Sequence, residues 1–306
     1  WTDSSGDGHV SVISGAAIER TFDFPAKSVR GLAAHDDGTF AVLLWHAGSE
    51  VLRLSKRNEN GGEIWSTSLN TEIAVADFWL GGSRLTYGNG LYAAYFTVRG
   101  TSGGFKEHLG DQLTYVDDDG YTQSGGWDWG CSHSLAQLVS YHPDLDRFVS
   151  VCSSDCFPGE GIFTNDSERV YEADGNCEGW VSAQLGQVAL SDGSWKLVFN
   201  ALDRTCCEGR GIALATIDES YQNSFTWLTN TDGAYERDPS IARLGSDVHT
   251  DRYLVGWTTT DDGAYWLGVI DGAGNFLTGP EEVTSAGVRW GNRDDSFRTR
   301  ADGSVS

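Results

Sequence analysis

Short apolar runs separated by turn residues recur along the whole chain. One example is "TFAVLLWH" from Thr39, which follows the turn "HDDG" and precedes a loop. Runs of about four to eight apolar residues bounded by Asp, Asn and Gly are typical of β-strands, whereas an amphipathic helix would show a sustained period near 3.6 residues. That period is missing, so the pattern predicts an all-β protein of many short strands joined by tight turns.

The strands are grouped into a repeated unit. Five stretches share one order of parts: a strand, an Asp- or Asn-containing turn, a more apolar strand, a loop of variable length and two further strands. These stretches begin at Ser28, Ser83, Ser132, Ala183 and Asp238. Each spans about 45–55 residues, the size of a four-stranded propeller blade.

A sixth unit opens with "DDSFRTRADG" at Asp294 and reaches only "SVS" at the end of the chain. The first residues include "GHVSVISGAAIERTFDF", which supplies the missing strands, so we expect both termini to share the last blade and leave no free sheet edge. The sequence thus resembles a six-bladed β-propeller of a secreted bacterial type, with one domain over residues 1–306. A seventh blade within residues 157–183 stays an open alternative.

Composition limits the partners and the compartment. The formal net charge of −23, with a pI near 4.4, disfavours binding to nucleic acids and to anionic membranes. No apolar run approaches the roughly 20 residues that span a bilayer, so we expect no membrane insertion. The chain starts on Trp1, has no Met and shows no leader, which indicates a processed, exported and soluble product. We expect a secreted or extracellular location, with the periplasm as an alternative.

The cysteines are even in number and confined to the middle of the chain. They are Cys131, Cys152, Cys156, Cys177, Cys206 and Cys207. This count predicts two or three disulfides in an oxidising compartment. Zinc is a weaker interpretation, because paired Cys-x-x-Cys motifs and histidines at finger spacing are missing. A vicinal Cys206–Cys207 bridge beside a local Cys152–Cys156 bridge, or cross-links between these two loops, both agree with the expected blade geometry.

The loops between second and third strands vary most in length and chemistry, and they emerge on one face of a propeller together with the links between blades. Variable loops on a rigid scaffold are where recognition usually occurs. Two residues of this face are candidates for catalysis, His108 and His133. The candidates for ligand binding are Arg99, Asp111, Trp129, Arg210, Trp257 and Arg293. Ordinary structural roles are the alternative for each: a loop brace for His108, a backbone hydrogen bond for His133 and interblade packing for Trp129.

Three functions fit these residues. Aromatic faces beside hydrogen-bonding groups suit sugars, so the first prediction is a secreted carbohydrate-binding protein. The first alternative is a polysaccharide lyase, in which His133 acts as the base, His108 assists it, and Arg99, Arg210 or Arg293 neutralises a uronate carboxylate; this alternative rests on analogy between folds. The second alternative is an extracellular scaffold with a protein partner. Whether the protein is an enzyme stays open.

No cofactor is required by any of these functions. Structural calcium is an alternative for the acidic turns "DSSGDG" from Asp3 and "VDDDG" at residues 116–120, although neither has the later Glu of an EF-hand loop. Asp-Gly hairpin turns explain the same residues without a metal. We therefore predict no metal site.

Overall fold

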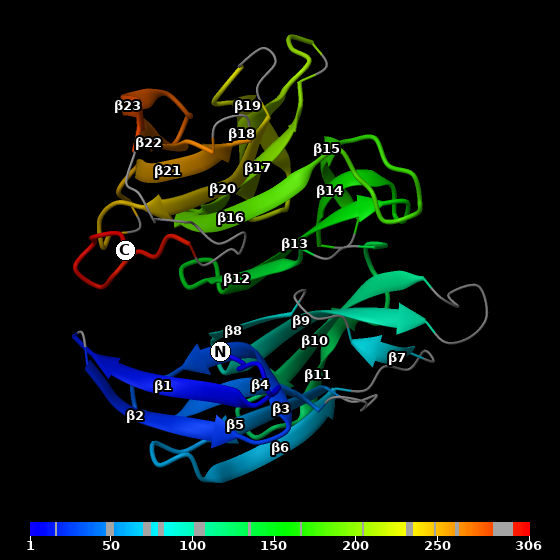
Figure 1. The fold of residues 1–306 in the computed structure, drawn as a ribbon, viewed down its shortest axis with the longest axis vertical. Coiled ribbons are helices and arrows are strands. Elements are labelled where there is room, and N and C mark those ends of the chain that lie inside the picture. Colours follow the sequence, from blue (N-terminus) through cyan, green and yellow to red (C-terminus); the bar gives the residue numbers. More distant parts are fainter. Residues whose placement is uncertain are drawn as a thin grey trace. The chain divides into compact units, whose positions relative to one another are not determined.

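The structure is a computed structural model that describes residues 1–15, 17–46, 52–69, 75–78, 83–100, 108–133, 136–165, 167–203, 205–230, 235–247, 249–260, 263–283 and 296–306. Within these ranges it contains 23 β-strands and no helix (Figure 1). The strands form six antiparallel sheets, one of them two-stranded. The all-β class and the sheet organisation of a β-propeller are therefore confirmed.

The chain divides into two compact units, Trp1–Tyr141 and His142–Ser306. The first unit contains three sheets. The first sheet pairs β1 (Gly8–Ser14) with β2 (Ala17–Phe24), and the second has the order β3 (Lys27–Ala34), β4 (Phe40–His46), β5 (Leu52–Arg57) and β6 (Glu63–Leu69). The third sheet contains β8 (Arg84–Gly88), β9 (Leu91–Gly100), β10 (Leu109–Asp117) and β11 (Thr122–Trp127), and β7 (Val75–Phe78) also pairs with β9.

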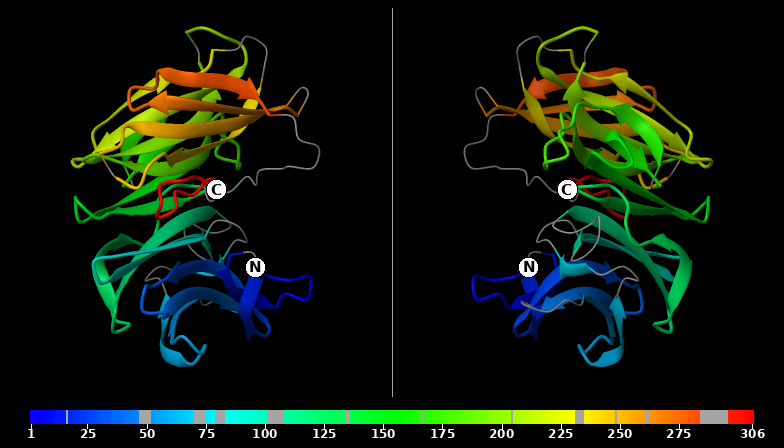
Figure 2. Two further views of the ribbon diagram at one scale, coloured as in Figure 1. Left: turned by 90° about the vertical axis from the view of Figure 1, so that its left-hand side faces the viewer. Right: turned by 90° about the vertical axis from the view of Figure 1, so that its right-hand side faces the viewer.

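The second unit contains the other three sheets, except for residues 138–141, which begin the first of these sheets and belong to the first unit. That sheet has the order β12 (Leu138–His142), β13 (Arg147–Asp155), β14 (Glu160–Thr164) and β15 (Glu168–Glu172). The next consists of β16 (Gln184–Ser191), β17 (Ser194–Leu202), β18 (Arg210–Asp218) and β19 (Asn223–Trp227). The last consists of β20 (Glu236–Arg243), β21 (Arg252–Thr259), β22 (Tyr265–Asp271) and β23 (Phe276–Glu282), which lie side by side in Figure 2.

Burial differs between the second and the fourth strand of a sheet. Eight successive residues of β17 are buried, because both faces of this strand are covered, whereas the central residues of β19 are exposed. β9 and β11 of the first unit show the same contrast. Second strands therefore appear in the sequence as continuous apolar runs, and fourth strands as polar, weakly patterned segments.

Four of the hairpin turns between third and fourth strands share one hydrogen-bond pattern. Asp117 accepts the backbone N–H groups of Asp119 and Tyr121 through Oδ1, at 3.1 and 2.8 Å. Asn58, Asp218 and Asp271 make the same pair of bonds two and four residues on. Side-chain acceptors of this kind stabilise the turn in place of backbone groups. This local chemistry explains why Asx and Gly recur at the blade period.

Two predictions about the sheets have different outcomes. The alternative of a seventh blade within residues 157–183 is wrong, because β14 and β15 complete the sheet that begins with β12. Residues 298–306 form the expected small hairpin, with an antiparallel bridge between Thr299 and Val305. The single domain over residues 1–306 and a last blade shared by both termini stay predictions.

Candidate functional site

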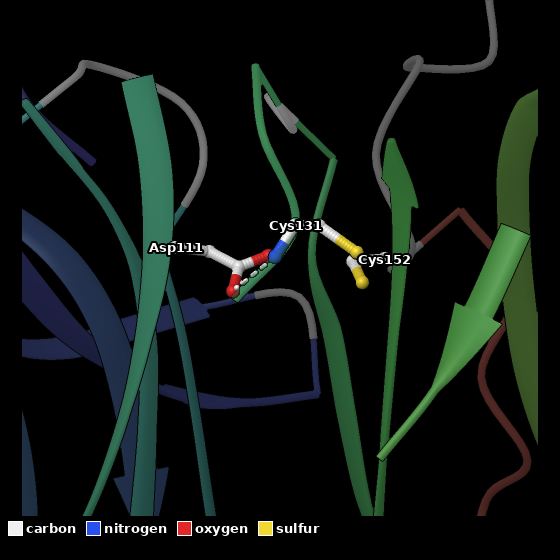
Figure 3. A group of neighbouring side chains, drawn as sticks. All are labelled: Asp111, Cys131 and Cys152. Atoms are coloured by element: carbon white, nitrogen blue, oxygen red, sulfur yellow. Dashed lines mark hydrogen bonds between the residues drawn. The ribbon is translucent and has the colours of Figure 1, made fainter. Parts of the chain in front are cut away.

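The predicted site residues of the first unit surround a buried carboxylate at the start of β10. Asp111 is 0% exposed, and its side chain accepts hydrogen bonds from the Tyr95 hydroxyl at 2.9 Å and the Trp127 indole at 3.1 Å. The backbone N–H of Cys131 also donates to Asp111 Oδ1, at 3.1 Å (Figure 3). A buried charge needs such donors. Asp111 therefore holds the site together and is too deep to contact a ligand.

Two glycines allow the "HLGD" and "WDWGC" segments to approach each other. A Cβ added to Gly110 would collide with the indole of Trp129, and one added to Gly130 would collide with Oδ1 of Asp111. The Gly130 N–H also donates to the Asp111 carbonyl, at 2.8 Å. The link after β11 thus lies directly against β10, because both close contacts involve a residue without a side chain.

This link brings the two candidate histidines together. The ring centroids of His108 and His133 are 5.7 Å apart, with the planes tilted by 59°. The Gly100 N–H donates to the His108 carbonyl, and the His133 N–H donates to the Leu109 carbonyl, both at 3.0 Å. His108 is exposed and His133 is half-buried. Both imidazoles are therefore held at the same end of the β9–β10 ladder.

Arg99 and Trp129 come from the same region of the first unit. Arg99 is the register partner of Leu109, next to His108, and its side chain is half-buried. Trp129 is also half-buried and packs against the hydrophobic core of the unit as well as against Gly110. This end of the ladder thus carries two imidazoles and Arg99, and the Trp129 indole packs against Gly110 beside it. Such a set can donate to and accept from a polyhydroxyl ligand, and the cation suits a carboxylate.

The remaining predicted binding residues lie elsewhere. Arg210 begins β18 in the second unit, where it is half-buried, forms a parallel bridge with Tyr235, and has a pKa that burial lowers. Trp257 is only 2% exposed and belongs to the core of β20–β22. Because the Trp257 indole is buried, neither of its faces is open to a ligand. The prediction that Trp257 lies on the binding rim is therefore wrong, and the residue belongs to the core. Arg293 lies outside the described residues.

The disulfides differ from both predicted pairings. Cys206–Cys207 is the vicinal bridge of one alternative, but Cys156 pairs with Cys177. The predicted Cys152–Cys156 bridge and the cross-links between the two loops are therefore wrong. Cys177 lies beyond β15, and its N–H donates to the Asp155 carbonyl. This contact brings together segments that are distant in sequence, which spacing alone does not show.

No described cysteine is free, since Cys131 and Cys152 are disulfide-bonded too. These two residues and Asp111 are drawn in Figure 3 and offer atom types that bind metals. Oxidised sulfur provides no thiolate, which is the form that ligates a metal. The group is therefore better explained by the hydrogen bonds of Asp111 than by a metal.

The acidic turns that suggested calcium use their carboxylates internally. Asp3 accepts the N–H groups of Ser5 and Asp7 through Oδ1 at 2.8 and 3.1 Å, and its Oδ2 lies 3.3 Å from Nε2 of His9. In the second turn, Asp117 Oδ1 accepts two backbone N–H groups and Oδ2 accepts from Gln123. These bonds explain both turns as Asx motifs.

Sequence analysis missed a polar network in the first unit. Lys56 Nζ lies 2.8 Å from Oδ1 of Asp118, and the Tyr87 hydroxyl donates to Oδ2 at 2.7 Å. Nε2 of His35 hydrogen-bonds to the Tyr92 hydroxyl at 2.7 Å. Burial, followed by the Asp118 hydrogen bond, raises the pKa of Tyr87 to about 12. Tyr87 and Tyr92 flank one hairpin turn, but Lys56, His35 and Asp118 lie near three other turns, so no local motif marks the network, which connects the sheets β3–β6 and β8–β11.

Comparisons with known proteins show distant structural similarity only. No family model and no curated protein matches the chain. Similar solved structures include a family 117 glycoside hydrolase of Zobellia galactanivorans (12% identity, 97% of this chain and 79% of that chain, TM-score 0.39). An endo-arabinase of Bacteroides thetaiotaomicron has 13% identity over 85% of this chain and 81% of that chain, with a TM-score of 0.35. A Synechocystis apocarotenoid oxygenase has 11% identity over 92% and 68%, with a TM-score of 0.47.

These similar structures differ in activity, and their identities are too low to indicate a shared function. In the part of the chain that the structure describes, no helix has the length and apolar character needed to cross a membrane. The fully paired cysteines are typical of proteins from oxidising compartments.

Proposed function

We propose that this protein is a secreted carbohydrate-binding protein and that its ligand contacts the His108–His133 site. The observation that carries the proposal is the approach of the two imidazole rings to 5.7 Å from separate segments. Neutral imidazole has one donor and one acceptor, which suits vicinal hydroxyl groups. Arg99 lies at the same end of the ladder, so a uronate-containing polysaccharide is the ligand class that would also use its guanidinium.

The frame of the site supports binding without rearrangement. The Asp111 side chain of β10 accepts hydrogen bonds from Tyr95 in β9, from Trp127 at the end of β11 and from the backbone N–H of Cys131 in the link that follows β11. His133 has a positive φ of 49°, a conformation that a non-glycine residue adopts only where its surroundings hold it. A preorganised site spends less binding free energy on ordering its side chains.

The same histidine pair favours a second candidate function, a polysaccharide lyase. In that reaction one imidazole removes the proton α to the uronate carboxylate, and Arg99 neutralises the carboxylate. The C–O bond at the β position then breaks, a C=C bond forms, and the leaving oxygen takes up a proton from the second histidine or from water. General-base catalysis by histidine operates near neutral pH.

The test is a screen of the whole protein against immobilised neutral and uronate-containing polysaccharides, with ultraviolet absorbance followed for unsaturated uronates. The binding function is supported if the protein is retained without new absorbance. This retention should be lost in His133→Ala and in His108→Ala, and it should be kept in the exposed control His249→Ala. Growth of absorbance that His133→Ala abolishes supports the lyase. Retention that is equal in all three variants would refute the site.

A further inference from the structure

A cleft of about 330 Å³ opens on the second unit, beside β15 and β19. Three of its walls are aromatic: Tyr171 from β15, and Phe225 and Trp227 from β19. Phe225 and Trp227 are two residues apart, so they lie on the same face of the sheet. Phe225 is 41% exposed, which leaves part of its ring open to a ligand.

The three rings stand nearly perpendicular to one another. The Tyr171 ring lies 5.6 Å from that of Phe225 at 79° and 6.1 Å from that of Trp227 at 86°. The Phe225 and Trp227 rings are 6.0 Å apart at 88°. The Tyr171 hydroxyl donates to the Leu202 carbonyl, which fixes that ring. The cleft is therefore a built corner of edge-to-face aromatics and not a gap between mobile side chains.

A buried carboxylate lies in the same cleft. Asp203 is 6% exposed, and its Oδ1 accepts the N–H and the hydroxyl of Thr205 at 3.0 and 2.7 Å. Its Oδ2 has no hydrogen-bond partner among the residues that the structure describes. The Cys206 and Cys207 N–H groups donate to the Asp203 carbonyl, at 3.2 and 3.1 Å. The turn that carries the vicinal disulfide therefore holds this carboxylate in the wall of the cleft.

Charge at the opening selects against an anionic ligand. Arg169 and Glu172 of β15 line the cleft and form an ion pair at 3.4 Å. Counting Asp203, the lining has two carboxylates and one guanidinium, which is already paired. A uronate or phosphate would meet net repulsion here, whereas a neutral hydroxyl group can donate to Asp203.

We propose that this cleft is a second ligand site, which binds a neutral sugar ring of a polysaccharide. The apolar face of the ring stacks on Phe225 or Trp227, and one hydroxyl group donates to Oδ2 of Asp203. The volume is near the lower end of the about 300–1,000 Å³ typical of small-molecule pockets, which suits one or two sugar residues. A proline ring could also stack on the aromatics, but it offers no donor to the carboxylate.

The experiment is isothermal titration calorimetry of the intact protein with five uncharged hexasaccharides. Each of them is built from one sugar: glucose, mannose, galactose, xylose or arabinose. We expect at least one to bind, and both Phe225→Ala and Asp203→Asn to weaken it by about tenfold. Asp203→Asn keeps an oxygen for the Thr205 turn, so this variant changes the ligand contact with little effect on folding. The exposed control Tyr121→Ala, in a hairpin of the first unit, should bind normally.

One further variant distinguishes this cleft from the His108–His133 site. His133→Ala should leave the affinity for the neutral oligosaccharide unchanged. Failure of all five oligosaccharides to bind would overturn the proposal. Equal affinity of the wild type, Phe225→Ala and Asp203→Asn would overturn it as well. A decaproline peptide is the probe for the other ligand class. If it binds to the wild type, if both variants lose this binding, and if the sugars do not compete with it, the cleft is a peptide site instead.

Discussion

His108 and His133 lie 5.7 Å apart between ring centroids, and the backbone of each is tied to the end of the β9–β10 ladder. The Gly100 N–H binds the carbonyl of the first, and the N–H of the second binds the Leu109 carbonyl. Since these bonds extend the sheet, the backbone of both histidines is fixed by the fold. One ligand can therefore contact both imidazoles without prior rearrangement of the chain.

The first prediction concerns the carboxylate below this pair. Asp111→Ala should lower the free energy of unfolding by about 3 kcal/mol, because Tyr95, Trp127 and Cys131 each lose a charged acceptor in a buried place. Urea unfolding measures the change. Asp36→Ala, at an exposed turn position, is the matched control and should stay within about 0.5 kcal/mol of the wild type. Equal stability of the two variants would show that Asp111 is not the anchor of the site.

The second prediction concerns pH and His9. Hydrogen bonds to Asp23, and then to Asp3, raise the pKa of His9 above the ordinary value of about 6.5. A raised folded-state pKa stabilises the hairpin β1–β2 below that ordinary value, and this contribution is lost as the pH rises through the folded-state pKa. An NMR titration of the His9 ring should give a midpoint above about 6.5 that falls in Asp23→Asn. An unchanged midpoint in this variant would contradict the assigned contact.

The third prediction concerns the Cys156–Cys177 bridge. Its sequence separation is 21 residues, so the double variant Cys156→Ser, Cys177→Ser should lose about 3 kcal/mol of stability through the greater freedom of the unfolded chain. The variant Cys206→Ser, Cys207→Ser is the matched control, because a bridge between neighbours closes almost no loop. Thermal unfolding that lowers the melting temperature equally in both variants would contradict this explanation.

The sheets could be predicted because their signal is local. The apolar run of β4 and the turn "HDDG" before it lie within a few residues of each other, as do Asp117 and the N–H groups that it binds. The sheet β12–β15 was predicted only in part, because β14 and β15 are short and carry weak patterns. Sequence repeats therefore located the blades better than they located the last strands of one blade.

The site was less accessible to sequence reasoning because it depends on long-range contacts. The juxtaposition of His108 and His133 follows from the blade order, but the burial of Asp111 requires Tyr95 and Trp127 to converge on it. Trp257 shows the opposite error. Its strand was located correctly, but the indole points into the core, and one-residue alternation of side chains decides that direction.

The most direct test of the proposed function is an NMR titration of the histidine ring protons with the polysaccharide fragment that the protein retains. We predict that the resonances of His108 and His133 shift together and saturate at one ligand concentration, while those of His249 stay unchanged. Saturable binding of the fragment with neither His108 nor His133 perturbed would contradict the assignment of this site.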